Sequence, residues 1–249
     1  MQCVILAGGL ATRMRPLTDV RPKALLDVAG APFIDHQLRW LARHGVTEAV
    51  LSIGYRGDML RAHVGDGARF GLRVSYVDEG EKLRGTAGAL RLALSEGALD
   101  EAFLVTYGDS FLPIDFADVW RRFRASGLPA AMTVFHNEGK FDTSNVIFVR
   151  TGSSPMREEL GEGRLVVYDK KRVTRPAADF TYIDYGLTAL ERRLVASDVP
   201  AEGKADLADL FHALSLRGEL FGIEVRDRFH EIGSHEGLEE LARWIAAHR

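Results

Sequence analysis

The sequence predicts an α/β fold with a three-layer core, a mixed and mostly parallel sheet, and a second half rich in strands. Short apolar runs alternate with helical patterns through the first half, and continuous apolar strands between helices are typical of a parallel sheet covered on both faces. After Ala130 the apolar runs follow one another without full helices between them, which indicates an antiparallel or mixed extension. We expect a single domain over residues 1–249, composed of the halves 1–128 and 129–249.

Apolar periodicity defines the elements of the first half. Ile34, Leu38 and Leu41 repeat at i, i+4 and i+7, which is a helical period, and Gly45 follows as a helix stop. The other elements predicted here are strands at 3–7, 49–53, 72–77 and 103–107 and helices at 58–64, 87–94 and 116–123.

The second half contains more strands than helices. Strands are predicted at 130–135, 144–149, 164–168, 181–190 and 220–225, and helices at 205–216 and 235–247. Leu238, Leu241 and Ile245 form the inner stripe of the last helix. The segment 151–163 is rich in Gly, Ser and Glu, and it is predicted to be an exposed hairpin connection.

Composition excludes several classes of protein. The net charge of −3 and the pI of about 6.3 remove a general electrostatic case for binding nucleic acid or an anionic membrane. The single cysteine, Cys3, allows no disulfide within the chain and fits a reducing compartment. No apolar run approaches the roughly 18 residues that span a bilayer. We therefore expect a cytoplasmic globular protein that binds neither nucleic acid nor membrane, and the sequence indicates no oligomeric state.

A basic cluster follows the first strand. The strand ends at Gly8 and Gly9, and four cations but only one anion, Asp19, lie between positions 13 and 23. Glycines let backbone N–H groups approach phosphate oxygens, and ligands of parallel sheets bind at the carboxyl ends of the strands. The spacing fits neither a P-loop nor a dinucleotide fingerprint. This segment therefore predicts a site for an anionic ligand.

The run from Leu6 to Ile34, L-A-G-G-L-A-T-R-M-R-P-L-T-D-V-R-P-K-A-L-L-D-V-A-G-A-P-F-I, closely resembles the opening signature of the sugar-1-phosphate nucleotidyltransferases. The resemblance continues in the family's order at 85–90, 107–109, 168–170, 182–186 and 231–233. Within the family, the layout is most similar to bacterial guanylyltransferases for mannose- or heptose-type phosphates. The resemblance implies a Rossmann-like nucleotide-diphospho-sugar transferase fold, with the nucleotide bound by residues 1–128 and the sugar phosphate by residues 129–249.

The resemblance also implies a reaction. An NTP and a sugar 1-phosphate would give an NDP-sugar and pyrophosphate with the help of Mg²⁺, and the finer likeness favours GTP with a mannose- or heptose-type sugar. The attacking phosphate monoester has a second pKa near 6, so it is mostly ionised at pH 7 and needs no general base. Catalysis is therefore expected to consist mainly of positioning and electrostatic stabilisation.

The family pattern assigns roles to residues around the nucleotide. Arg13 would hold the departing β- and γ-phosphates, and Lys23 would bridge the α-phosphate and the incoming sugar phosphate, so these two are the expected catalytic residues. The expected nucleotide-binding residues are Leu6, Ala7, Gly8, Gly9, Thr12, Gly85 and Thr86. Ala11 departs from the family pattern, in which a glycine is usual.

Other residues are expected to bind the sugar phosphate and the metal. Lys170 matches the lysine that receives the sugar phosphate, and the adjacent Lys171 is the alternative. Asp109 follows a strand end, where a carboxylate suits Mg²⁺, and Glu231 is the second expected metal ligand in place of the family's usual aspartate. The remaining expected sugar-phosphate-binding residues are Asp184, Gly186 and Asn145.

Two other functions remain open at this stage. The chain could be a catalytically silent regulatory homologue that binds NDP-sugars, although such a protein would not need Arg13, Lys23 and Asp109 together. It could instead be a cytidylyltransferase for a non-sugar phosphate such as phosphocholine, for which an aromatic cage around the ammonium is expected. Between 140 and 190 the aromatic candidates for such a cage are Tyr168, Tyr182 and Tyr185. The acidic residues Asp78, Glu79 and Glu81 are interpreted as an acidic loop in preference to a site that reads the base.

Overall fold

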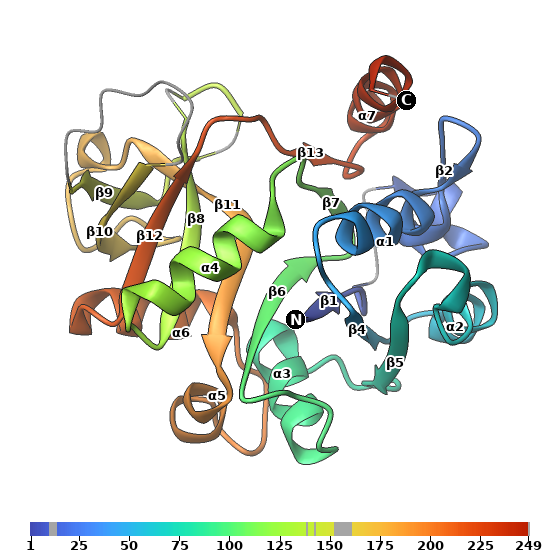
Figure 1. Ribbon diagram of the computed structural model, residues 1–249, viewed down its shortest axis with the longest axis horizontal. Coiled ribbons are helices and arrows are strands. Elements are labelled where there is room, and N and C mark those ends of the chain that lie inside the picture. The colour runs from blue at the N-terminus through green and yellow to red at the C-terminus, as the bar shows by residue number, and fades with distance from the viewer. Residues whose placement is uncertain (10–13, 138, 142, 152–160, 249) are drawn as a thin grey trace.

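A nine-stranded sheet organises the chain in the computed structural model, which describes residues 1–9, 14–137, 139–141, 143–151 and 161–248 (Figure 1). Its strand order is β5-β4-β1-β6-β11-β8-β12-β10-β9. The strands are β1 (Gln2–Leu6), β4 (Glu48–Ile53), β5 (Arg73–Asp78), β6 (Ala102–Tyr107), β8 (Ala130–His136), β9 (Val146–Arg150), β10 (Gly161–Tyr168), β11 (Tyr182–Glu191) and β12 (Leu220–Val225).

The sheet is parallel in its first half and mixed in its second. β1 pairs in parallel with β4 and with β6, and β4 pairs in parallel with β5. β11 lies antiparallel between β6 and β8, β12 is parallel to β8, and β10 is antiparallel to both β12 and β9. The expected α/β fold with a mixed sheet and a strand-rich second half is therefore confirmed.

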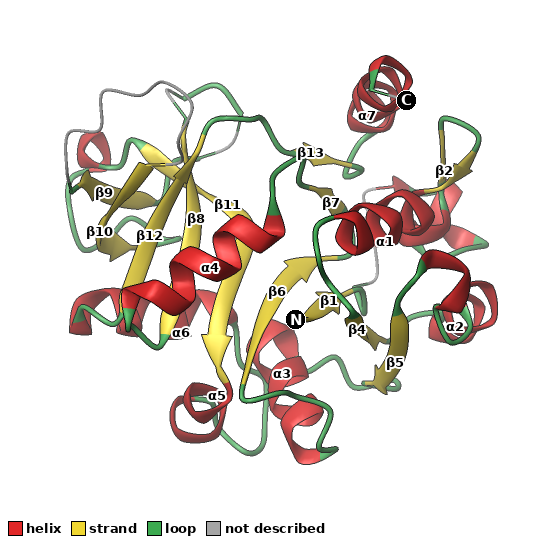
Figure 2. Cartoon of the chain, viewed as in Figure 1, coloured by secondary structure: helices red, strands yellow, loops and turns green. Residues whose placement is uncertain are grey.

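Helices cover both faces of the sheet (Figure 2). α1 (Phe33–Arg43), α2 (Gly57–Val64) and α4 (Phe116–Ser126) contribute to one core cluster, and α3 (Gly85–Ser95), α5 (Arg192–Asp198) and α6 (Leu207–Arg217) to the other. Successive side chains of β1 pack into different core clusters, because Cys3 and Ile5 belong to the first cluster and Val4 belongs to the second. This division is the three-layer arrangement that the sequence predicted.

A third core cluster lies outside the main sheet. The last helix, α7 (His235–Ala247), packs Leu241 and Ile245 with Phe111 and Ile232 at one short ribbon and with Val28 of another. One ribbon is the antiparallel pair β7 (Ser110–Phe111) and β13 (His230–Glu231), and the other is β2 (Asp27–Val28) with β3 (Ala31–Pro32). This cluster fixes the segment after β6 relative to the C-terminal helix.

The structure corrects the sequence prediction at two places. α5 was not expected, because it is short and buries only Leu194 and Val195. β10 begins at Gly161 rather than at 164, because its first residues pair with β12. The expected hairpin pairing of β9 with β10 is confirmed, while residues 152–160 of its connection lie outside the described part of the chain.

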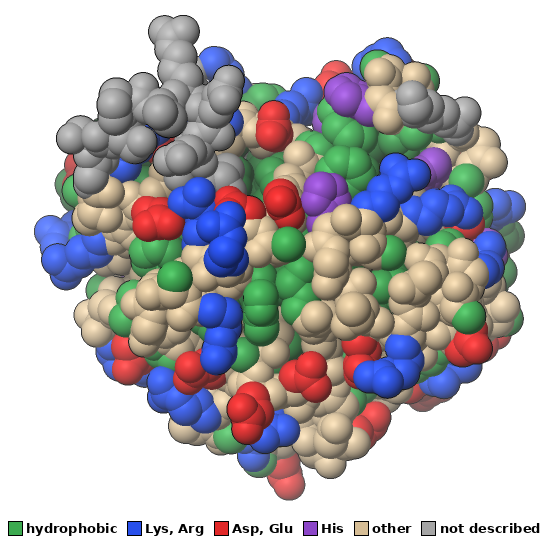
Figure 3. Space-filling model, in the orientation of Figure 1, with side chains coloured by type: hydrophobic (Ala, Val, Ile, Leu, Met, Phe, Trp, Pro, Cys, Tyr) green, Lys and Arg blue, Asp and Glu red, His purple; other side chains and the backbone are tan. Residues whose placement is uncertain are grey.

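Two surface findings bear on partners. On the face drawn in Figure 3, basic and acidic side chains are interspersed rather than gathered into a continuous basic stripe. Among the described residues, none of the helices has both the length and the apolar character needed to cross a bilayer.

Candidate active site

A pocket of about 340 Å³ opens at the carboxyl ends of β1 and β6. Because these two strands are parallel neighbours, their carboxyl ends meet at one edge of the sheet, where ligands of such sheets bind. Of the residues predicted for the site, the pocket is lined by Leu6, Ala7, Gly8, Gly9, Lys23, Gly85, Thr86 and Asp109. Thr12 and Arg13, and the unusual Ala11, lie outside the described residues.

Closely approaching backbones form the base of this pocket. A Cβ atom on Gly8 would lie 2.6 Å from Oε1 of Glu79, and one on Gly54 would lie 2.9 Å from the Gly8 carbonyl oxygen. A Cβ atom on Gly108 would lie 2.7 Å from that of Ala7. Space therefore requires glycine at Gly54 and Gly108, where the neighbours are backbone or Ala7, whereas the group nearest to Gly8 is the end of the Glu79 side chain.

Lys23 and Asp109 form an ion pair in the pocket wall. The Lys23 ammonium donates to Oδ2 of Asp109 at 2.8 Å. Lys23 is the first residue of the short 3₁₀ helix η3 (Lys23–Leu25), and Asp109 lies two positions after the end of β6. The Lys23 side chain is 17% exposed and the Asp109 side chain 41%. The carboxylate is therefore open to further ligands, whereas the lysine is held in place.

The β7–β13 ribbon brings Glu231 next to Asp109. Glu231 pairs with Ser110, and the Ile232 N–H donates to the Asp109 carbonyl oxygen at 3.0 Å. Lys23 belongs to the same cluster, because a Cβ atom on Gly233 would lie 3.7 Å from its Nζ atom. The two expected metal ligands, far apart in the sequence, are thus carried by neighbouring segments.

The donor set at this point suits Mg²⁺. Asp109 lines the pocket, and Glu231 is carried by the segment that pairs beside it, so these are the carboxylates that could hold an ion here. Mg²⁺ commonly takes one or two carboxylates and fills its remaining positions with water and substrate phosphate. Within the described ranges, no group of three or more His, Cys, Asp or Glu side chains is placed to hold an ion.

The N-terminus of α3 forms another wall of the pocket. Gly85 has φ +76°, and a Cβ atom there would lie 2.4 Å from the Ala205 carbonyl oxygen. Thr86 donates its hydroxyl hydrogen to Oδ1 of Asp206 at 3.1 Å and accepts from the Leu207 N–H at 2.8 Å. Gly85 and Thr86 are therefore held by the segment that leads into α6.

Glu79 differs from the sequence interpretation of its loop. Asp78 and Glu81 are exposed, but Glu79 is half-buried and lines the pocket. Its carboxylate accepts from the Arg84 N–H at 2.8 Å and from the Ser52 hydroxyl at 3.3 Å. It therefore anchors the loop that precedes α3.

The residues predicted for the sugar side meet around Asn145. The Asp184 N–H donates to the Asn145 side-chain oxygen at 3.0 Å, and the Asp169 N–H donates to the Asn145 carbonyl oxygen at 2.8 Å. The Asn145 N–H donates in turn to the Tyr182 carbonyl oxygen at 3.0 Å. Asn145 therefore joins the end of β10, the start of β9 and the bend in β11.

Asp169 fixes the turn that presents Lys170. Its carboxylate accepts backbone N–H groups from residues 171–174, each at 2.9 Å, and the Thr174 hydroxyl at 2.7 Å. Burial acts to raise the pKa of Asp169, but these bonds, led by those from Thr174, hold that pKa well below its usual range. Asp169 therefore stays charged, and its carboxylate oxygens are occupied by hydrogen bonds from the loop that follows it.

Asp184 lies in a different electrostatic environment. Burial raises the pKa of Asp184 to about 6, although a hydrogen bond from the Gly186 N–H and the positive charge of Lys170 both act to lower that pKa. Gly186 has φ +102° at a break in the pairing of β11 with β8, which is typical of a β-bulge. The bulge turns Gly186 toward Asp184, and the positive charge that acts on Asp184 is that of Lys170.

Tyr107 links the two groups of residues. It lines the pocket, and its ring is buried so that its pKa lies well above the usual value. The same phenol is influenced by the carboxylates of Asp184, Asp206 and Asp109. A Cβ atom on Gly186 would lie 3.8 Å from Cδ2 of Tyr107, so the Tyr107 ring lies between the pocket and the bulge beside Asp184.

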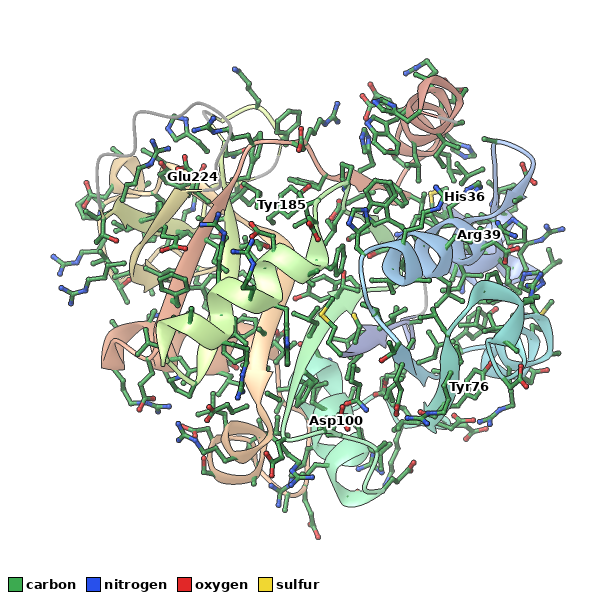
Figure 4. All side chains as sticks on the ribbon, viewed as in Figure 1. His36, Arg39, Tyr76, Asp100, Tyr185 and Glu224 are labelled. Atoms are coloured by element: carbon green, nitrogen blue, oxygen red, sulfur yellow. The ribbon has the colours of Figure 1, made fainter. Side chains whose placement is uncertain are left out.

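The three candidate tyrosines do not form a cage. Tyr168 packs edge-on against Phe211, Tyr182 packs against Phe148 and donates to Glu224, and Tyr185 packs against Phe135 and Phe229. Figure 4 shows Glu224 and Tyr185 at separate places in the strand-rich half. This arrangement provides no shared aromatic site for an ammonium group.

Sequence reasoning did not identify Tyr107 or Lys204 as site residues, although both line the pocket. Tyr107 stands within the matched motif 107–109 and could have been found there. Lys204 stands in a segment without any motif, so only the fold reveals it.

Comparison with known proteins supports the fold and places the chain among relatives. The family model described as nucleotidyl transferase matches residues 2–144. The chain is 40% identical over 129 residues to N-acetylmuramate alpha-1-phosphate uridylyltransferase of Neisseria meningitidis, covering 52% of this chain and 54% of that protein. It is 29% identical over 237 residues to mannose-1-phosphate guanyltransferase beta-A of Xenopus laevis, covering 94% and 61%. The chain thus spans little more than half the length of these relatives.

A solved structure shares the fold along the whole chain. A UDP-glucose pyrophosphorylase in complex with UDP-glucose superimposes with a TM-score of 0.75 at 14% identity, covering 100% of this chain and 99% of that one. The Rossmann-like arrangement expected from the sequence is therefore the one observed.

Asp184 makes stability depend on pH in a predictable direction. The pKa of Asp184 rises from the usual 3.8 to about 6 on folding. Its contribution to the free energy of unfolding is therefore fully present below the unfolded-state pKa and is lost as the pH rises through 6. Between pH 4 and pH 7, the unfolding free energy of the wild type should fall by about 2 kcal/mol relative to Asp184→Asn. Urea titrations of both proteins across this range measure the difference, and parallel pH profiles would contradict the assignment.

Proposed function

Because the chain belongs to the nucleotidyl transferase family, we propose that it transfers a nucleotidyl group from an NTP to a sugar 1-phosphate. The products are an NDP-sugar and pyrophosphate, as in an EC 2.7.7-type enzyme. The observation that carries the proposal is that two groups of residues lie on either side of the Tyr107 ring. A pocket with a glycine base and the Lys23–Asp109 pair adjoins a cluster in which Lys170 and Asp184 interact.

In the proposed reaction, an oxygen of the sugar phosphate attacks the α-phosphorus of the NTP. The new phosphorus–oxygen bond forms as the bond to pyrophosphate breaks, and the ionised sugar phosphate needs no general base. Lys23 lies where the two phosphates would meet and offsets their mutual repulsion. Arg13 is proposed to hold the departing pyrophosphate, and Thr12 to contact the nucleotide, on the family pattern alone.

Backbone and sugar-binding groups complete the proposed roles. Leu6 to Gly9 would bind the nucleotide with Gly85 and Thr86, so that residues 1–128 act as the nucleotide half. In the half 129–249, Lys170 would bind the sugar phosphate and Asp184 would accept from sugar hydroxyls. Asn145 and Gly186 would act by holding Asp184, because both bond to it.

Mg²⁺ is the proposed cofactor, with Asp109 and Glu231 as its protein ligands. When bound there, the ion would withdraw charge from the phosphates and reduce the repulsion between the two carboxylates and the substrate. Lys23 already bonds to Asp109, so the lysine is positioned to share that carboxylate.

For the base and sugar we propose GTP and a mannose- or heptose-type 1-phosphate. The support is the likeness to a mannose-1-phosphate guanyltransferase along 94% of the chain, whereas the likeness to the uridylyltransferase extends over 52%. These substrates, and a single buried cysteine, favour a reducing, cytoplasmic compartment.

A substrate panel tests the proposed function. Four NTPs are combined with several sugar 1-phosphates and with phosphocholine, and pyrophosphate release is measured. We expect turnover with sugar 1-phosphates and the highest kcat/KM with GTP. A protein that binds NDP-sugars but stays silent throughout the panel would be the regulatory homologue instead, and a preference for UTP, dTTP or CTP would reject the assignment of guanine.

Lys170 and its neighbour Lys171 provide a matched pair. Lys170→Ala should raise the KM for the sugar 1-phosphate about tenfold or more, because a charge-assisted contact to phosphate is lost, and should leave the KM for NTP nearly unchanged. Lys171→Ala removes the same charge from the next position of the same turn. Steady-state kinetics with each substrate varied would show the reverse pattern if Lys171 were the ligand.

Asp109 and Glu231 should differ in severity. Asp109→Asn removes the carboxylate that contacts Lys23 and should lower kcat by at least about a hundredfold. Glu231→Gln should have a smaller effect, because its longer side chain can act on the ion through a water molecule. Turnover of each variant is measured against Mg²⁺ concentration. Activity that survives complete chelation of divalent ions would remove the metal from the proposal.

A further inference from the structure

The pocket at the edge of the sheet has two ends of different chemistry. At one end, after β6, Lys23 bonds to Asp109 at 2.8 Å. At the other end, a Cβ atom on Gly8 would lie 2.6 Å from Oε1 of Glu79 and 3.5 Å from the N atom of Gly54, the residue after β4. Because β4 and β6 pair with opposite sides of β1, the Glu79 carboxylate and the Lys23–Asp109 pair lie on opposite sides of that strand.

Glu79 presents a carboxylate that its surroundings hold in place. The Arg84 N–H donates to Oε2 at 2.8 Å, and the hydroxyl of the buried Ser52 donates to Oε1 at 3.3 Å. A carboxylate offers about four acceptor positions, so these two bonds leave capacity for donors of a ligand. The other acids of this loop, Asp78 and Glu81, are exposed and do not line the pocket.

The charge of Glu79 decides which part of an NTP can lie beside it. A triphosphate and a carboxylate repel each other at short range, whereas the Lys23 ammonium at the opposite end attracts phosphate. An NTP whose triphosphate meets Lys23 therefore directs its base toward Glu79. Leu83 and Ala89 line the pocket as well, and they provide apolar contacts for the faces of a base.

Lys204 adds a hydrogen-bond donor beside the elements assigned to the nucleotide. It lines the pocket from the segment between α5 and α6, and a Cβ atom on Gly85 would lie 3.2 Å from its Cγ atom. The Ala205 carbonyl oxygen accepts from the N–H groups of Ala87 and Gly88 at 3.1 and 3.2 Å, which fixes this segment to the first turn of α3. Lys204 forms no ion pair within the described part of the chain, so its ammonium is available to a ligand.

We propose that Glu79 and Lys204 read the base of the NTP and select bases in which a ring N–H stands next to a carbonyl group. Glu79 accepts from the ring N–H, and Lys204 donates to the neighbouring carbonyl oxygen. Guanine, uracil and thymine present this edge. Guanine adds its 2-amino group as a second donor to the carboxylate, in agreement with the GTP proposed above.

Adenine and cytosine present the opposite edge. Their ring nitrogen is an acceptor, which the Glu79 carboxylate repels, and it stands next to an amino group, which the Lys204 ammonium repels. Such a base would leave both protein groups without a partner, and this is the condition under which a binding site discriminates strongly. The assignment rests on the proposed function and states what sets the class of base that the site accepts.

The base selectivity of two variants tests these contacts. In the wild type, kcat/KM should be at least about a hundredfold higher with GTP than with ATP or CTP. Lys204→Met keeps the apolar stem and removes the ammonium, and Glu79→Gln keeps the size of the side chain and removes the charge. Each should raise the KM for GTP about tenfold and lower the preference over ATP by a similar factor, because ATP does not use these contacts. The KM for the sugar 1-phosphate should change less than about twofold.

The loop before α3 supplies matched controls. Lys82→Met and Glu81→Gln make the same two substitutions at exposed residues that do not line the pocket, and both should keep the selectivity of the wild type. A wild type that prefers ATP or CTP, an unchanged selectivity in both test variants, or equal losses in the controls would refute the base contacts. A preference for UTP or dTTP that both test variants weaken would uphold the contacts and reject guanine.

Calorimetric titration with each NTP and Mg²⁺, without the sugar phosphate, separates the base contacts from the proposed function. An inactive wild type that binds GTP more tightly than ATP, and loses this difference in Lys204→Met and Glu79→Gln, would contradict the function alone. An active wild type whose two variants bind every NTP as it does would contradict the base contacts alone.

Discussion

The parallel pairing of β1 with β4 and β6 is the constraint on which the site depends. β1 is buried in the middle of this group, and its alternate side chains pack into the helix layers on both faces. Because the strands run in one direction, the chain must leave β1 at Gly8 and β6 at Gly108 on the same edge. The glycines then let the two exits approach closely, so the pocket is formed by backbone that the sheet itself positions.

The strand-rich half attaches to this core through β11, which lies antiparallel between β6 and β8. Its bulge at Gly186 interrupts the pairing beside Asp184, and Asn145 then joins Asp184 to the turn after β10. Asp169 and Asp184 show how hydrogen bonding decides the state of a partly buried carboxylate. The first receives five donors and its pKa falls, whereas the second receives one from Gly186 and its pKa rises.

The small ribbon of β7 and β13 has a similar role for Asp109 and Glu231, the proposed metal ligands. It contains only two residues on each strand, so its own hydrogen bonds hold it weakly, and the packing of Phe111, Ile232 and Leu241 under α7 stabilises it. The last helix therefore contributes to the site without supplying a ligand. Its apolar stripe was predictable from the spacing of Leu238, Leu241 and Ile245, but the surface that the stripe covers was not.

The sequence by itself determined the helices and long strands, through apolar periodicity, and the pocket beside β1, through the local run of glycines and basic residues. These features depend on neighbours within a few positions, which is why α7 and β12 are found at their predicted ranges. Only the tertiary structure decided what depends on distant pairing, namely the hydrogen bonds of Asn145 to Asp169 and Asp184 and the presence of Lys204 in the pocket wall. No local pattern encodes such contacts, because each is produced by strand order and by helix packing across the whole sheet.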